Sequence, residues 1–194
     1  MTTGVFGGAF DPPHFGHVAL ARAALERFGF ERLLVVPAGD PPHKAVATSA
    51  EIRCRMAELA FAGMPRVEIL RIELEPGGPR FTVDTLRLLG KRHDDLVLLV
   101  GADQFAGFPS WREPDTILEL ARLAVASRPG YDDKELSSVL ATLARPERVG
   151  FFPIPAHPVS SEQIRERVRG GLPIDELVPE AVVGEIARLG LYRG

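Results

Sequence analysis

The segment from Gly7 to His17 carries the residue types of a phosphate-binding loop. It reads GGAFDPPHFGH, and the two glycines at its start permit a tight turn and close approach of the backbone to a ligand. His14 and His17 stand on either side of Gly16, where a segment with helical spacing begins. Because the free amides at a helix start favour an anion, this pattern predicts two imidazoles and a helix terminus directed at one phosphate group.

The sequence allows two other interpretations of this segment. A His-x-x-His pair can chelate a metal, but only Asp11 is close enough in the sequence to supply a third ligand. The two histidines can also be loop residues with structural hydrogen bonds. The segment is neither a Walker A loop nor a G-x-G-x-x-G dinucleotide fingerprint. Its position, glycines and prolines together favour phosphate binding.

Strand and helix signals alternate along the chain and place this motif between the first strand and the first helix. Short apolar runs predict strands at residues 3–6, 33–37, 67–72, 96–101, 123–127 and 149–154. Helical periodicity predicts helices at residues 18–28, 49–62, 82–92, 114–121 and 132–144. The alternation predicts a doubly wound, Rossmann-like α/β fold with a parallel sheet and a ligand site at the carboxyl ends of its strands.

Two further helices, at residues 160–168 and 179–189, follow without an intervening strand. The length of 194 residues fits one domain, so we expect residues 1–194 to form a single domain with a C-terminal helical part from about residue 159.

Composition narrows the class of protein. The formal net charge is −3 and no basic stripe is present, so we expect no nucleic-acid partner. The single cysteine, Cys54, excludes an internal disulfide, and we expect it to be an unreactive residue at the surface or half-buried. No signal segment or membrane-spanning run stands out, so we expect a cytoplasmic protein without a membrane partner. The sequence leaves a homo-oligomer open.

Five segments in the same order resemble one known family. The H-x-G-H part of the first motif resembles the signature of the nucleotidyltransferase superfamily, and its longer form resembles the nicotinate-nucleotide adenylyltransferase family. The other similar segments are PPHK at 41–44, FTVDTL at 81–86, GAD at 101–103 followed by Trp111, and VSSEQIR at 159–165.

One residue departs from the family pattern. Glu162 stands where the family often has threonine. A carboxylate is unfavourable at a helix start that binds triphosphate, so either Glu162 turns away and caps the helix, or the phosphate contacts there rest on backbone amides and Arg165.

The resemblance implies a nucleotidyltransferase that moves the adenylyl group of ATP onto nicotinate mononucleotide, giving deamido-NAD and pyrophosphate. It implies Mg²⁺ bound with ATP and no metal site built from the protein itself. The implied catalytic residues are His14, His17 and Lys44. The implied ATP contacts are Gly7, Gly8, Phe10, Gly16, Arg128, Ser160, Ser161 and Arg165.

The resemblance also implies a second subsite, for nicotinate mononucleotide. Trp111 would stack on the pyridine ring, and Asp103 would accept hydrogen bonds from a ribose hydroxyl, although Asp103 also suits a helix N-cap. Thr82 and Thr85 would offer hydroxyls and amides to the nicotinate carboxylate.

Two other functions remain open at this point. The same fold can act on another phosphate acceptor, such as phosphopantetheine, glycerol phosphate or nicotinamide mononucleotide. Alternatively, the protein can be a sensor that binds ATP without turning it over, although a sensor needs no second subsite.

Overall fold

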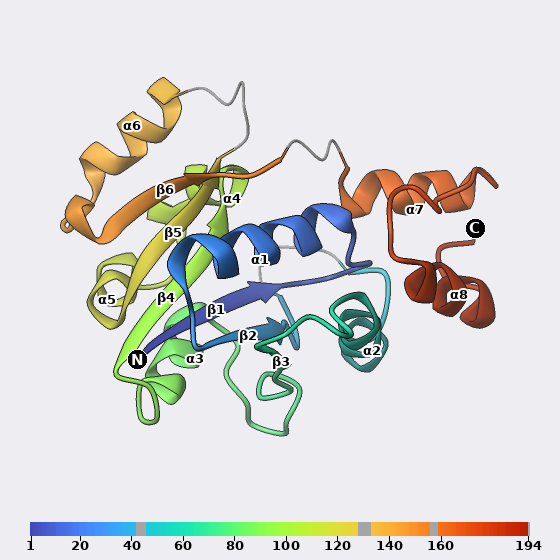
Figure 1. Ribbon diagram of the computed structural model, residues 1–194, viewed down its shortest axis with the longest axis horizontal. Helices are drawn as coiled ribbons and strands as arrows, with labels where there is room; N and C mark the ends of the chain where they lie inside the picture. The colour runs from blue at the N-terminus through green and yellow to red at the C-terminus, as the bar shows by residue number, and fades with distance from the viewer. Residues whose placement is uncertain (42–45, 128–132, 156–158, 194) are drawn as a thin grey trace.

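The structure is a computed structural model that describes residues 1–41, 46–127, 133–155 and 159–193. Within these residues, one six-stranded parallel sheet has the strand order β3-β2-β1-β4-β5-β6 (Figure 1). Its strands are β1 Thr2–Gly8, β2 Arg32–Pro37, β3 Val67–Ile69, β4 Asp95–Gly101, β5 Ala121–Ser127 and β6 Val149–Pro153. The doubly wound α/β fold expected from the sequence is confirmed.

The direction of winding reverses on either side of β1. This strand pairs with β2 on one side and β4 on the other, so Val5 lies between Leu34 and Leu98. In open parallel sheets, ligands bind beyond the carboxyl ends of the strands where the strand order reverses. A ligand site is therefore expected among the residues that follow Gly8 and Gly101.

Alternate residues of the strands supply two separate cores. Phe6, Val35 and Val97 face one side of the sheet and pack with residues of α1, α2 and the C-terminal helices. Their neighbours Val5, Leu34 and Leu98 face the other side, against α3, α4, α5 and α6. This division follows from the two-residue period of a strand buried on both faces.

The helices connect the strands and cover both faces. Figure 1 shows α1 lying across the sheet, while α7 and α8 lie beyond the carboxyl end of β1, next to α2. The α-helices are α1 Phe15–Phe28, α2 Ala50–Ala60, α3 Thr82–Leu89, α4 Ala102–Ala106, α5 Pro114–Leu120, α6 Asp133–Thr142, α7 Ser161–Arg169 and α8 Glu180–Leu189.

Three details differ from the expectations. Strand β3 ends at Ile69 rather than at residue 72, and the short helix α4 was not expected because five residues are too few to show a helical period. Cys54 is fully buried, so the prediction of a surface or half-buried thiol is wrong. Helix α2 packs against β2 and β3 and also against α8, so more of its circumference is covered than a surface helix exposes.

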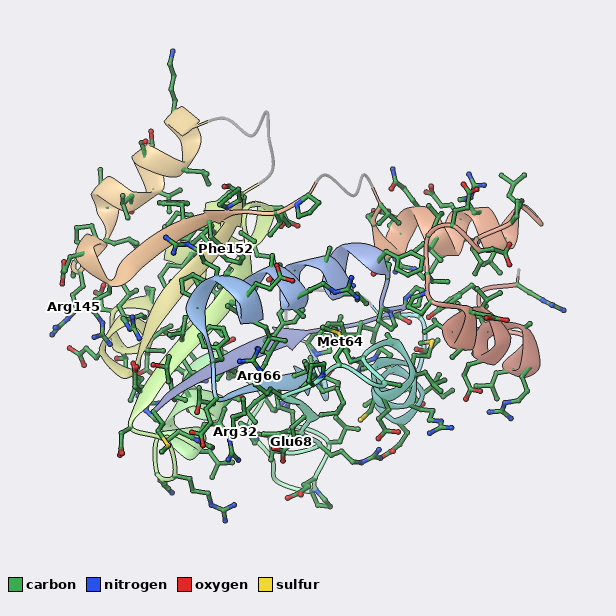
Figure 2. The ribbon with its side chains drawn as sticks, in the orientation of Figure 1. Arg32, Met64, Arg66, Glu68, Arg145 and Phe152 are labelled. Atoms are coloured by element: carbon green, nitrogen blue, oxygen red, sulfur yellow. The ribbon has the colours of Figure 1, made fainter. Side chains whose placement is uncertain are left out.

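The outer edge of the sheet, at β3, carries exposed charged side chains. Figure 2 shows Arg32 and Glu68 near each other on β2 and β3, where their charged groups are 4.0 Å apart. The neighbouring Arg66 donates to the backbone oxygen of Phe30 at 3.0 Å. Arg32 begins β2, so this group lies at the amino ends of the strands, opposite the expected site. Among the described residues, no helix has the length and apolar character needed to cross a membrane.

Candidate active site

His14 and His17 lie together at the start of α1. His14 is the N-cap residue and His17 lies in the first turn, and their rings are stacked with centroids 3.8 Å apart and an interplanar angle of 30°. The backbone amide of His14 donates to Nδ1 of His17 at 3.2 Å. Because Nδ1 accepts this hydrogen bond, the neutral His17 ring carries its proton on Nε2, which is then a donor.

Two glycines of this loop lie close to aromatic rings, so a larger residue at either point would displace a ring. A Cβ at Gly16 would lie 3.0 Å from the His14 ring, and one at Gly8 would lie 2.9 Å from the Phe10 ring. Phe10 itself has a positive φ of 51° and is buried, with its ring packed edge-on against Phe6. Its side chain belongs to the core, so only its backbone remains for the ATP contact implied by the sequence.

A cavity of about 500 Å³ opens at the carboxyl ends of β1 and β4. Its volume suits a small organic ligand. Among the described residues, those that line it include Gly8 and Ala9 of the same loop but not His14 or His17. Six residues expected from the sequence do line it: Gly7, Gly8, Thr82, Thr85, Asp103 and Trp111.

Aromatic residues form one wall of this cavity. Trp111 follows the 3₁₀ turn Phe108–Ser110, is partly exposed, and packs on Phe108 with 5.4 Å between ring centroids. The Arg112 guanidinium lies 4.5 Å above the ring of Phe81. The lining of the cavity therefore includes an indole face and a guanidinium, together with the carboxylates of Glu73 and Asp103.

Two polar residues of the cavity differ from expectation. Gly101 is the N-cap of α4, so the N-cap interpretation of Asp103 is wrong, and its carboxylate lies instead in the first turn. The Thr85 hydroxyl donates to Glu73 Oε1 at 2.6 Å, and Thr85 is buried. A hydroxyl has one proton, so Thr85 cannot also donate that proton to a ligand while this bond is made.

The C-terminal signature contacts the phosphate loop. Ser161 Oγ donates to the backbone oxygen of Pro12 at 2.8 Å, and Arg165 donates to that of Asp11 at 2.7 Å. Ser160 caps α7 by accepting from the amide of Gln163, whose side chain accepts from the amide of Ser160 in return. Gln163 completes this capping box, so the interpretation that Glu162 caps the helix is wrong; Glu162 is exposed.

Two expected site residues, Lys44 and Arg128, lie outside the described residues. In the part of the chain that the structure describes, no group of three or more His, Cys, Asp or Glu side chains is arranged to hold a metal.

Comparison with known proteins gives a consistent assignment. A model of the cytidylyltransferase-like family matches residues 5–167. A Tropheryma whipplei (strain Twist) protein named "Probable nicotinate-nucleotide adenylyltransferase" is 41% identical over 96% of this chain and 97% of its own length. A Thermomicrobium roseum protein of the same name is 41% identical over 98% of this chain and 91% of its own.

The chain belongs to the nicotinate-nucleotide adenylyltransferase family. The fold agrees, because a solved structure of the Plasmodium falciparum nicotinic acid mononucleotide adenylyltransferase complexed with NaAD superposes with a TM-score of 0.77. That likeness covers 98% of this chain and 97% of the other at 18% sequence identity, so it is evidence for the fold alone.

In this member of the family, a buried arginine connects the loops after β1 and β2. Arg53 on α2 is fully buried, and within the described residues its guanidinium donates to backbone oxygens alone. Burial lowers the pKa of its guanidinium, and the negative charge of Asp11 opposes that shift. Its acceptors are Ala9 at 2.8 Å, Ala38 at 2.6 Å, Gly39 at 2.9 Å and Thr48 at 3.3 Å.

Sequence reasoning missed Arg53, although a signal was present. Residues 53, 56, 57 and 60 follow helical spacing and are all buried, so a charged residue stood on an apolar face. Glu73 was also missed, since it lies in an irregular segment without periodicity. Burial raises the pKa of the Glu73 carboxyl, opposed by its hydrogen bonds from Thr85 and the amide of Gly39.

Proposed function

We propose that the chain transfers the adenylyl group of ATP to nicotinate mononucleotide, giving deamido-NAD and pyrophosphate in NAD biosynthesis. One observation carries this proposal: a stacked imidazole pair at a helix start stands beside a separate cavity with an aromatic wall. The imidazole pair suits the phosphates of ATP, and the cavity suits a pyridine nucleotide. The names of the full-length relatives support the same reaction.

The reaction needs positioning and charge stabilisation more than proton transfer. The attacking phosphate is mostly dianionic at neutral pH, because its second pKa is about 6. Oriented donors then supply the main contribution by stabilising charge on the oxygens around the α-phosphorus. Nε2 of His17 is such a donor, since Nδ1 accepts from the backbone. The first amides of α1 add to the positive field.

Magnesium fits this site as a companion of ATP rather than as a resident ion. The one carboxylate within the phosphate loop, that of Asp11, already accepts from Ala47, Thr48 and Tyr192. When bound with ATP, Mg²⁺ would neutralise part of the phosphate charge. The protein's own residues would orient the nucleotide around it.

The acceptor subsite explains why a pyridine nucleotide is proposed. Trp111 offers an indole face for stacking, and Asp103 offers a carboxylate that can accept from ribose hydroxyls. The Thr82 hydroxyl lines the same cavity, and together with the amides at the start of α3 it would meet the nicotinate carboxylate. For the compartment we propose the cytoplasm, consistent with a single buried thiol.

A pyrophosphate-release assay tests the function directly. The protein is mixed with ATP and Mg²⁺, and then with nicotinate mononucleotide or nicotinamide mononucleotide in parallel. We expect pyrophosphate and deamido-NAD with the acid, at a kcat/KM that exceeds the value for the amide by a factor of up to about 10⁴. A preference for the amide would make the acceptor assignment wrong, and no pyrophosphate with either mononucleotide would contradict the proposed function.

A further inference from the structure

The carboxylate of Asp11 collects hydrogen bonds from two distant parts of the chain. Asp11 is buried, with a relative exposure of 2%. From the loop after β2, the amide of Ala47 donates to Oδ2 and the hydroxyl of Thr48 donates to Oδ1 at 2.8 Å. From the C-terminal tail, the hydroxyl of Tyr192 donates to Oδ1 at 2.7 Å. One side chain in the phosphate loop thus joins both neighbouring segments.

The local structure explains how the tail reaches Asp11. Helix α8 buries Val182 and Ile186 against the core and ends at Gly190, which has a left-handed conformation with φ of 62°. The amide of Leu191 then bonds back to the oxygen of Ile186 at 3.0 Å, as in a Schellman turn. Two residues after this turn begins, the Tyr192 hydroxyl reaches Asp11 in the loop.

A change in the position of Asp11 would be transmitted along the chain to His14. Two prolines separate it from His14, and each fixes φ near −65°, so the spacer has little freedom. A shift of the Asp11 side chain and backbone would therefore move the N-cap of α1. Displacements on the order of 1 Å can cost about 10²-fold in rate when reacting groups must be aligned.

We propose that Tyr192 is a positioning residue for adenylyl transfer, whose hydroxyl acts through Asp11 to orient the loop that carries His14 and His17. This inference rests on the proposed function. Ser161 and Arg165 contact backbone oxygens of the loop, whereas Tyr192 contacts the carboxylate of Asp11. Burial and the charge of Asp11 raise the pKa of the Tyr192 hydroxyl, so it remains a donor throughout the neutral range.

The test compares Tyr192→Phe with the unmodified chain. This substitution removes one hydroxyl and keeps the ring. We expect kcat to fall about 10-fold, because misalignment affects the transfer step. The affinity for nicotinate mononucleotide should be unchanged. Asp11 does not line the cavity, so its displacement leaves the binding surface for this ligand in place. The affinity is measured separately through the fluorescence of Trp111, which is the single tryptophan of the chain and lines the cavity.

A matched control separates positioning from general stability. Val182 on α8 is fully buried, and Val182→Ala weakens the same helix without removing a contact to Asp11. We expect Val182→Ala to lower the melting temperature at least as much as Tyr192→Phe and to leave kcat within about twofold, because its cavity lies away from the reacting groups. Equal losses of kcat in the two variants would assign Tyr192 a purely structural role and overturn the inference.

A double-variant cycle tests the route through Asp11. Asp11→Ala removes both carboxylate oxygens and should lower kcat at least as much as Tyr192→Phe, and the double variant should be no worse than Asp11→Ala alone. Additive losses would show that Tyr192 acts elsewhere. If the unmodified chain is active and Tyr192→Phe retains its kcat, the inference alone is wrong. If the unmodified chain releases no pyrophosphate, the proposed function is wrong and the inference falls with it.

Discussion

The two halves of the candidate site are built differently. The phosphate loop is tied by buried side chains, since Asp11 accepts from three donors and Arg53 donates to four backbone oxygens. The acceptor cavity is bordered by a five-residue helix, a 3₁₀ turn and the partly exposed Trp111. Charges near it form exposed pairs, such as Arg87 with Glu113.

This contrast corresponds to two different physical tasks. Stabilising charge in a transition state requires donors that are already in place, because reorganising them during the reaction costs free energy. Binding a flat ring requires a surface that adapts around it and excludes water. Buried hydrogen bonds suit the first task, and short elements at the surface suit the second. Substitutions in the two regions should therefore change different kinetic constants.

The largest effect is expected from the phosphate loop. His17→Ala removes a donor and should lower kcat by roughly 10²- to 10³-fold. The affinity for nicotinate mononucleotide should be retained, since His17 does not line the cavity. Pyrophosphate release under saturating substrates measures the first quantity, and Trp111 fluorescence measures the second.

His93 offers a control for this substitution. It lies between α3 and β4 and contacts Thr3 near the amino end of β1, opposite the site. His93→Ala should leave turnover unchanged. Near-normal turnover of His17→Ala would contradict the catalytic role of the loop.

A smaller effect of the opposite kind is expected in the cavity. Trp111→Ala removes the stacking surface and should raise KM for nicotinate mononucleotide about 10-fold, since an aromatic pair contributes about 1–1.5 kcal/mol. The kcat at saturation should change little. Trp111→Phe keeps an aromatic face, so its KM for nicotinate mononucleotide should lie between those of Trp111→Ala and the unmodified chain. A loss of kcat with unchanged KM would erase the contrast between the regions.

The smallest effect is expected on thermal stability, from Glu73 in the lining of the cavity. Its carboxylate accepts hydrogen bonds from Thr85 and Gly39. Burial raises the pKa of its carboxyl above the ordinary 4.5. The folded chain therefore binds this proton more tightly than the unfolded chain. Stability contributed by Glu73 is present below pH 4.5 and falls as pH rises through the raised pKa.

Glu73→Gln removes this titration while keeping an acceptor for Thr85. We expect its melting temperature at pH 7 to exceed that of the unmodified chain by a few degrees, and the difference to shrink as pH falls toward 4. Carboxyls with lowered pKa, such as Asp95, are common to both proteins and cancel in the comparison. A difference that grows as pH falls would contradict the assigned direction.

The fold could be predicted because its signals are local. Apolar runs such as Leu96–Val100 and the helical spacing after Gly16 are visible within short windows. His14 and His17 were predicted to lie close together because residues three positions apart at a helix start lie on the same side of the helix. Six of the residues that line the cavity were predicted, through the segments that resemble the family, whereas others such as Glu73 were not.

The supporting contacts could not be predicted in the same way. Tyr192 and Asp11 are 181 positions apart, and neither position carries a pattern that refers to the other. Asp11 had been considered only as a metal ligand, because the donors that occupy its carboxylate come from a loop and from the tail. The Thr85 hydroxyl was assigned to the ligand for a similar reason, since its partner Glu73 lies in an irregular segment.

The burial of Cys54 gives the molecule an internal reporter. This single thiol adjoins Arg53 on α2, has no exposed surface, and its pKa is raised by burial. The thiol contacts the side chains of Glu58 and Arg71, which are partly exposed. A thiol-specific reagent can therefore modify it only when these side chains or α2 itself move. Its labelling rate in native buffer reports such openings beside the helix whose arginine joins the two loops, and any nucleotide that prefers the closed arrangement will slow that rate.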